Sequence, residues 1–127
     1  MRQGFTRTRA STLSRMKKLL FWGLLLLVVV ASLLPIAYLP PPVFSIWDKL
    51  QHATAFAALC MLGLMAYGSH RIRVIVGLLM LGAAIEIAQA ATGWRYGEWL
   101  DLLADGVGIG AAMVLMQAWP RLQALAD

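Results

Sequence analysis

"LLFWGLLLLVVVASLLPIAYL", residues 19 to 39, is a stretch without a charged side chain, and it decides the class of this protein. A helix over these residues would rise about 30 Å, which matches the hydrocarbon core of a bilayer. A cleaved signal peptide is the alternative, because a basic segment precedes the run and a weak cleavage site lies near Ala31. The apolar run continues to Leu39, so an uncleaved membrane span is favoured. We expect Pro35 to kink its outer end and the prolines at 40 to 42 to stop it.

The composition of the whole chain agrees with a bilayer as its solvent. Of its 127 residues, 61% are hydrophobic and 13% are charged, which lies far outside the average of soluble domains. Cys60 is the one cysteine, so the sequence excludes a disulfide framework and a cysteine-based zinc site. The net charge of +5 does not indicate nucleic acid, because the basic residues are not interleaved with aromatic ones. Anionic lipid is the expected partner of the basic segment.

Three further apolar runs follow the first, each about one bilayer thickness in length. Their connections are short, so neighbouring helices should be antiparallel. The sequence therefore predicts an all-α polytopic membrane protein with four transmembrane helices in an antiparallel bundle. Its predicted parts are a basic segment at 1–18, a four-helix domain at 19–119 with spans at 19–39, 47–67, 72–91 and 100–119, and a tail at 120–127.

The distribution of basic residues predicts the orientation of the bundle. Nine of the eleven Lys and Arg residues fall in the first 18 residues, in the turn between spans two and three, or just after span four. Positive charge concentrates on the cytoplasmic side of a membrane. Both termini are therefore expected to be cytoplasmic, with Trp47, Trp94, Tyr96 and Trp99 forming an aromatic belt at the outer interface.

Polar side chains recur at the outer ends of three spans. Asp48 and His52 share a face of span two by the i, i+4 rule, and Asp101 and Asp105 share a face of span four. A carboxylate facing lipid costs roughly 2.5 kcal/mol or more, so these groups should face one another inside the bundle. The predicted ligand-binding cluster comprises Asp48, Lys49, His52, Glu86, Gln89, Arg95, Asp101 and Asp105.

Small residues are expected to let the helices approach closely where no hydrophobic effect drives them together. The stretch "DGVGIGAA" places Gly106 and Gly110 at GxxxG spacing, while Gly108 follows the face of Asp101 and Asp105. The predicted helix-packing glycines are Gly82, Gly106, Gly108 and Gly110.

The order of these motifs resembles the VanZ-like family of small bacterial membrane proteins. "DKLQHATAF" opens span two, "IEIAQ" lies in span three, and "WRYGEWLDLLADGVGIG" enters span four. The resemblance covers about residues 47 to 110 and implies a bacterial cytoplasmic (inner) membrane protein with a role in the cell envelope. The family's matching polar positions fall on Asp48, Lys49, His52, Glu86, Gln89, Arg95 and Asp101, and its glycine falls on Gly108. Asp105 departs from the pattern, because asparagine is commoner there.

Three functions fit the predicted cluster. It could bind a lipid head group, a cell-wall precursor or a glycopeptide-type ligand, with ion pairs such as Asp48 with His52, or Lys49 or Arg95 with Glu86 or Asp101, shaping the pocket. It could instead be an envelope lipid-modifying enzyme that uses His52, Glu86 and Asp101 as catalytic residues. The third function is structural or partner-anchoring, with the ion pairs locking three helix ends in register.

The sequence does not require a cofactor, and no metal-ligand set is predicted. The carboxylates of the cluster would suit a divalent cation such as Mg²⁺ or Ca²⁺. One histidine on that side argues against a zinc hydrolase with two or three histidine ligands. The expected partners are membrane lipids and a cell-wall precursor or lipid head group, without nucleic acid, and homo-oligomerisation stays open.

Overall fold

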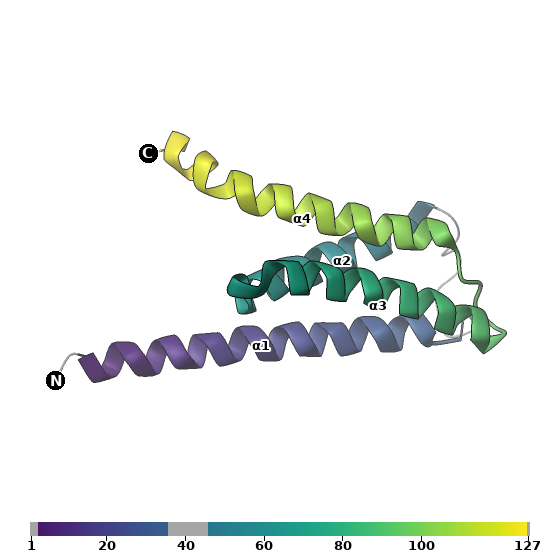
Figure 1. Cartoon of the computed structure of the whole chain (residues 1–127), viewed down its shortest axis with the longest axis horizontal. Coiled ribbons are helices and arrows are strands. Elements are labelled where there is room, and N and C mark those ends of the chain that lie inside the picture. The colour runs from purple at the N-terminus through teal and green to yellow at the C-terminus, as the bar shows by residue number, and fades with distance from the viewer. Residues whose placement is uncertain (1–2, 36–45, 127) are drawn as a thin grey trace.

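The protein is a bundle of four long helices (Figure 1). The structure, a computed structural model, describes the backbone of residues 3–35 and 46–126 and the side chains of 11–35 and 46–120. Over these residues it contains no strand, which confirms the all-α prediction. The helices are α1 (Gln3–Leu33), α2 (Ile46–Ala66), α3 (Arg71–Thr92) and α4 (Trp99–Ala126), with a 3₁₀ turn at Gly68–His70 between α2 and α3.

Each helix is long and apolar enough to cross a membrane. The candidate spans are Ser11–Leu33, Ile46–Ala66, Gly68–Thr92 and Trp99–Pro120, as expected of a multi-pass membrane protein. The 31 residues of α1 rise about 46 Å, which exceeds the hydrocarbon core of a bilayer by several turns. The basic segment is helical from Gln3, and its helix is continuous with the first span.

Two helix ends differ from the sequence prediction, and a proline is involved in each. α1 ends at Leu33 instead of Leu39, so Pro35 lies beyond the helix and does not kink it. The residue before a proline is driven out of the helical region by its ring, which explains a stop at this point. Residues 36 to 39 and the prolines at 40 to 42 lie outside the described residues. α4, in contrast, continues through Pro120 to Ala126.

The helices run up and down, so that the described ends of α1 and α4 nearest the termini lie at the same end of the bundle (Figure 1). α2 is the central helix: it packs most extensively against α4 and also contacts α1 and α3. The described parts of α1 and α4 make no contact with each other. The beginning of α2, the end of α3 and the beginning of α4 therefore meet at the opposite end, which is called the loop end below.

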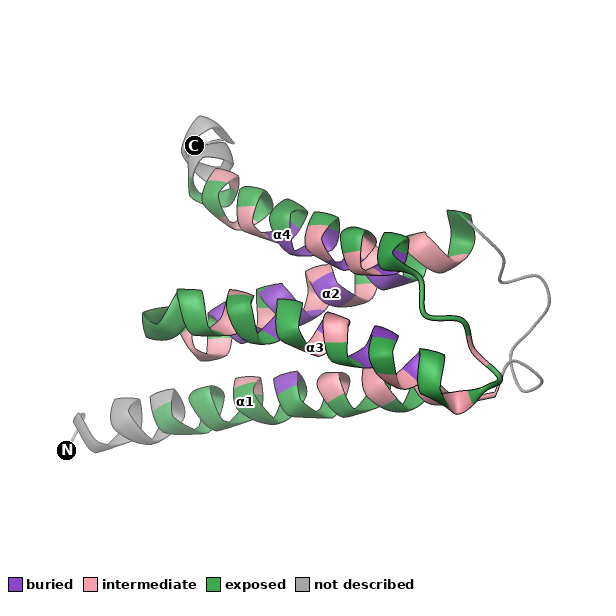
Figure 2. Ribbon diagram, turned by 45° about the vertical axis from the view of Figure 1, so that its right-hand side comes forward, coloured by how far each residue is buried: buried purple, intermediate pink, exposed green. Residues whose placement is uncertain are grey.

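The apolar core is small, and large apolar side chains cover the outside (Figure 2). The core consists of Phe21, Phe56, Leu59, Cys60, Leu64, Leu78, Ile85, Ile109 and Ala112. Cys60 is a free cysteine and serves as a small core residue. Exposed leucines, tryptophans and methionines on all four helices form a surface that suits lipid rather than water.

Aromatic residues hold the middle of α1 against the rest of the bundle. Trp22 donates a hydrogen bond from Nε1 to the Tyr67 hydroxyl at 2.9 Å. Phe21 packs edge-on against both rings, and the Lys18 ammonium lies 5.4 Å from the centre of the Tyr67 ring. These contacts tie α1 to the last turn of α2.

Glycine permits close approach at two contacts between helices. A Cβ atom on Gly108 would collide with the carbonyl group of Ala53, and one on Gly82 would lie 2.5 Å from Asp105 Oδ2. Gly106 and Gly110 have nothing within 4 Å of a Cβ position, so among the described residues they do not pack against another helix. Successive residues of a helix are 100° apart, which places Gly106 and Gly110 on the face opposite Gly108.

We predict that Gly108→Ala lowers the free energy of unfolding by about 1–3 kcal/mol, because the new methyl group must separate α2 from α4. Gly110→Ala is the matched control and should leave stability unchanged or raise it by up to about 1 kcal/mol through helix propensity. Unfolding of the purified chain in detergent measures both changes. Equal effects of the two substitutions would contradict the packing role of Gly108.

Candidate functional site

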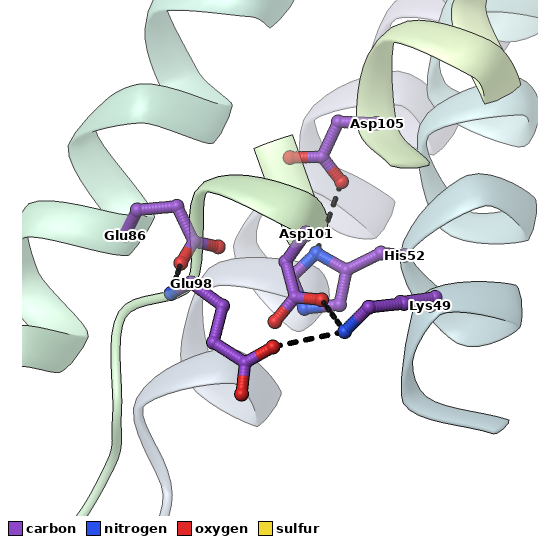
Figure 3. Close-up of polar contacts among 6 residues, drawn as sticks. All are labelled: Lys49, His52, Glu86, Glu98, Asp101 and Asp105. Atoms are coloured by element: carbon purple, nitrogen blue, oxygen red, sulfur yellow. Dashed lines mark hydrogen bonds and ion pairs between the residues drawn. The ribbon is translucent and has the colours of Figure 1, made fainter. Parts of the chain in front are cut away.

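A polar cluster lies at the loop end, between α2, α3 and α4 (Figure 3). Its side chains come from the first turns of α2 and α4, from the last part of α3, and from the loop that joins α3 to α4. The cluster comprises Lys49, His52, Glu86, Glu98, Asp101 and Asp105, with Asp48 at its edge.

Lys49 joins α2 to α4 through two ion pairs. Its Nζ lies 2.9 Å from Glu98 Oε2 and 3.0 Å from Asp101 Oδ1. The two carboxylates differ in burial: Asp101 is 3% exposed, whereas the Glu98 side chain is 52% exposed. Water screens the Glu98 pair, so the pair with Asp101 carries most of the energy.

His52 and Asp105 form a second, deeper pair between the same two helices. Their Nδ1 and Oδ1 atoms are 3.0 Å apart, and both side chains are buried. The sequence-based expectation paired His52 with Asp48, which is one turn away on the same helix. The structure instead pairs His52 with Asp105, because the contact between Gly108 and Ala53 brings the two helices together one turn further along.

Glu86 connects α3 to the loop that leads into α4. Its Oε2 accepts a hydrogen bond of 2.7 Å from the backbone N–H of Glu98. Gly97 lies directly against α3, since a Cβ atom on it would meet the backbone carbonyl oxygen of Glu86. The loop starts at Gly93, whose φ of 77° favours glycine and turns the chain back after α3. The carboxylate of Glu86 therefore fixes the loop end of the bundle.

Two predicted ligand-binding residues face α1 instead of the acidic groups. Gln89 donates to the Ser32 carbonyl oxygen at 2.9 Å. Arg95 donates from Nε to Leu34 O at 3.2 Å and from a terminal nitrogen to Ala31 O at 3.3 Å. Arg95 does not pair with Glu86 or Asp101, which corrects that expectation. The last carbonyl groups of a helix lack intrahelical partners, and these donors satisfy them.

Asp48 lies between the cluster and an open groove. One of its carboxylate oxygens lies within 4.8 Å of a ring nitrogen of His52 and within 4.8 Å of a carboxylate oxygen of Asp101. The groove has a volume of about 630 Å³ and runs between α1 and α2. It is lined by Leu24, Val28, Ala31, Ser32, Trp47, Asp48, Leu50, Gln51, His52, Thr54, Ala55, Phe56, Ala58 and Arg95.

Some polar contacts of the site were not predicted. Glu98 is not among the predicted binding residues, although its side chain contacts Lys49 and its backbone N–H donates to Glu86. Trp94 donates from Nε1 to the Leu33 carbonyl oxygen at 3.3 Å. An acceptor on the backbone of α1 has no signal in the sequence, so these bonds could not be foreseen. The predicted belt residues Trp47, Trp94, Tyr96 and Trp99 are exposed at the loop end.

The arrangement supports three kinds of chemistry. The carboxylates can bind a cation, the donors at Arg95 can bind a phosphate, and the His52–Asp105 pair has the geometry of a base held by a carboxylate. In comparisons with protein-family models, with curated proteins and with solved structures, nothing matches this chain. The VanZ-like resemblance therefore stays a prediction from the motifs.

We predict that Lys49→Met lowers the free energy of unfolding by about 3 kcal/mol, because it leaves Asp101 buried and unpaired. Glu98→Gln removes a half-exposed partner and should cost about 0.5 kcal/mol or less. Thermal or denaturant unfolding in detergent measures both. Adding Asp101→Asn to Lys49→Met should recover much of the loss; no recovery would show that the lysine stabilises the bundle by some other contact.

Proposed function

We propose that this chain is a VanZ-like protein of the bacterial cytoplasmic membrane that binds an amphipathic lipid. The lipid is a membrane phospholipid or a lipid-linked cell-wall precursor. Its head group contacts the polar cluster at the loop end, and its acyl chain follows the groove between α1 and α2. This proposal rests on one observation: the groove is lined by polar side chains at one end and by apolar side chains along the rest of its length.

The polar end of the groove offers groups that suit a phosphate-containing head group. Asp48, His52 and Arg95 line it there, at the level where α1 ends. A guanidinium has five N–H donors, so the two hydrogen bonds from Arg95 to α1 leave donors for a phosphate. Asp48 supplies an acceptor for a hydroxyl or ammonium group of the same head group.

The rest of the groove offers an apolar wall. Leu24 and Val28 from α1 face Phe56 and Ala58 from α2 along its length. Both helices are exposed elsewhere to the surrounding membrane, so an acyl chain can enter sideways without crossing a polar surface. A soluble head-group analogue would gain nothing from this wall, which favours a lipid over a small polar ligand.

The proposed orientation places the loop end at the outer face of the membrane, with both termini in the cytoplasm. The basic residues Arg15, Lys17 and Lys18 of α1, together with Arg71 and Arg73 of α3, lie toward the opposite end. Positive charge on the cytoplasmic side supports that assignment. The lipid head group is then one of the outer leaflet.

A lipid-modifying enzyme is the second candidate function. It is favoured by the buried hydrogen bond between His52 and Asp105, since a carboxylate that holds one ring nitrogen orients the other as a base. In that case His52, Glu86 and Asp101 act on the head group that the groove delivers. A purely structural role for the cluster accounts for the ion pairs of Lys49 but not for the groove.

We predict that Ala55→Phe, which fills the groove, weakens binding of fluorescent phosphatidylglycerol to the purified chain by at least about tenfold, equal to 1.4 kcal/mol. Ala111→Phe is the matched control, because Ala111 is exposed on α4 and outside the groove. Titration in a maltoside detergent measures the affinity, and the wild-type chain should bind diacylglycerol, which lacks the phosphate, more weakly.

Equal affinities of the two phenylalanine variants would contradict binding in the groove. Mass spectrometry of the recovered lipid separates the two candidate functions. A lipid of unchanged mass after incubation supports a binding protein, and a lipid of altered mass that requires His52 supports the enzyme.

We predict that alkaline phosphatase fused after residue 127 is inactive in cells and that a green fluorescent protein at the same point is fluorescent. Both outcomes follow from a cytoplasmic C-terminus. A phosphatase fused after Tyr96, in the loop between α3 and α4, is the control and should be active. Activity of the C-terminal fusion would reverse the proposed orientation and place the cluster at the inner face.

A further inference from the structure

Two buried carboxylate oxygens of the polar cluster have no hydrogen-bond partner among the described residues. They are Glu86 Oε1 and Asp105 Oδ2. Asp105 is completely buried, and Glu86 is 9% exposed. Their other oxygens are engaged, by the Glu98 backbone and by His52. A buried polar atom without a partner costs free energy, so each of these oxygens calls for a partner other than the described residues, such as a bound ion.

The two carboxylates and an imidazole converge on one place. One ring nitrogen of His52, one carboxylate oxygen of Glu86 and one carboxylate oxygen of Asp105 all lie within 4.8 Å of one another. Two ligands on opposite sides of a cation with bonds of about 2.1 Å are about 4.2 Å apart, so small side-chain rotations bring all three into contact with one ion. The three side chains come from three different helices, and each helix is packed against at least one of the others.

A glycine lets α3 approach this place closely. Gly82 of α3 lies beside Asp105, and a Cβ atom there would be 2.5 Å from Oδ2 and 3.1 Å from Leu102. Any other residue at this position would therefore press on the oxygen that lacks a partner. The absence of a side chain lets Oδ2 lie against α3, where Glu86 follows one turn later.

The charges around the place favour a cation. Asp48, Glu86, Glu98, Asp101 and Asp105 supply five carboxylates, whereas Lys49 pairs with two of them, Glu98 and Asp101, and His52 pairs with Asp105. Arg95 directs its guanidinium to the carbonyl groups of α1. Carboxylates that share a buried site repel one another when ionised, and either a cation or a shared proton relieves that repulsion.

We propose that His52, Glu86 and Asp105 bind one divalent metal ion within the bundle. A ligand set of one imidazole nitrogen and two carboxylate oxygens suits a first-row ion such as Mn²⁺ or Zn²⁺ better than Mg²⁺, which prefers oxygen alone. The ion joins α2, α3 and α4 below the head-group end of the groove. This inference goes beyond the lipid-binding function and does not depend on it, because the ligands belong to the chain.

The test uses the full chain without a polyhistidine tag, purified in maltoside, freed of lipid and treated with chelator. Electron paramagnetic resonance of added Mn²⁺ measures the bound fraction. The wild-type chain should bind one ion, and Glu86→Gln and Asp105→Asn should each weaken binding by at least about tenfold. Glu98→Gln, which removes a half-exposed carboxylate outside the ligand set, is the matched control and should change the affinity less than about threefold.

A spectroscopic measurement keeps the proposal testable if a ligand variant does not fold. The chain has two histidines, and His70 is exposed at the end of the bundle remote from the cluster. The His70→Gln chain should still bind Mn²⁺ and should show electron spin-echo modulation from an imidazole nitrogen, which then belongs to His52.

Absence of saturable Mn²⁺ or Zn²⁺ binding by the folded wild-type chain up to millimolar concentration would overturn the proposal. Binding without an imidazole signal, or with unchanged affinity in folded Glu86→Gln and Asp105→Asn chains, would also overturn it, because the ion would then lie elsewhere. A failure of metal binding leaves the fluorescent-lipid titration unaffected, so the two proposals can fail separately.

Discussion

The close approach of α2 and α4 at Ala53 and Gly108 is the contact on which the polar cluster depends. It sets the distance between the two helices at the depth where His52 meets Asp105. One turn nearer the loop end, the same spacing lets Lys49 reach Asp101. Backbone contact of this kind needs a glycine, because a Cβ atom would collide with the carbonyl group of Ala53. Close packing matters here because a bilayer offers no hydrophobic force that would push the helices together. The ion pairs then add strength to a geometry that the glycine makes available.

The attachment of α1 follows a different principle. Its apolar side chains are mostly exposed, but one stripe from Phe21 to Val29 packs against the core of the other helices. Beside the start of this stripe Trp22 binds Tyr67, and near the end of the helix Gln89 and Arg95 satisfy carbonyl groups that the helix cannot satisfy itself. The groove beside α2 follows the same stretch of α1, since Leu24 and Val28 line it.

Much of the fold was predictable because it depends on local patterns. Four apolar runs of bilayer length, short connections and the i, i+4 spacing of Asp101 and Asp105 follow directly from the sequence. The helices confirm the four runs and the short connections that flank α3. Pairing between helices was less predictable, because it depends on how each helix is rotated about its axis. His52 therefore pairs with Asp105 rather than Asp48, and the GxxxG spacing of Gly106 and Gly110 marks a face that packs against none of the described helices. Bonds from Arg95 to backbone carbonyl groups leave no trace in the side-chain pattern at all.

The remaining question is why a small membrane protein buries so many carboxylates. Interhelical ion pairs alone would need one acid for each base, yet Lys49 serves both Asp101 and Glu98, while Glu86 and Asp105 each keep an unpartnered oxygen. Apolar residues of similar size would hold three helices together at lower cost, since a buried charge is stabilising only when it is fully paired. The excess of buried acceptors thus makes the free energy of folding less favourable, and a bound ligand can offset this loss. The cluster lies beside a groove with an apolar wall, and this combination is the reason for proposing a ligand there rather than a purely structural role.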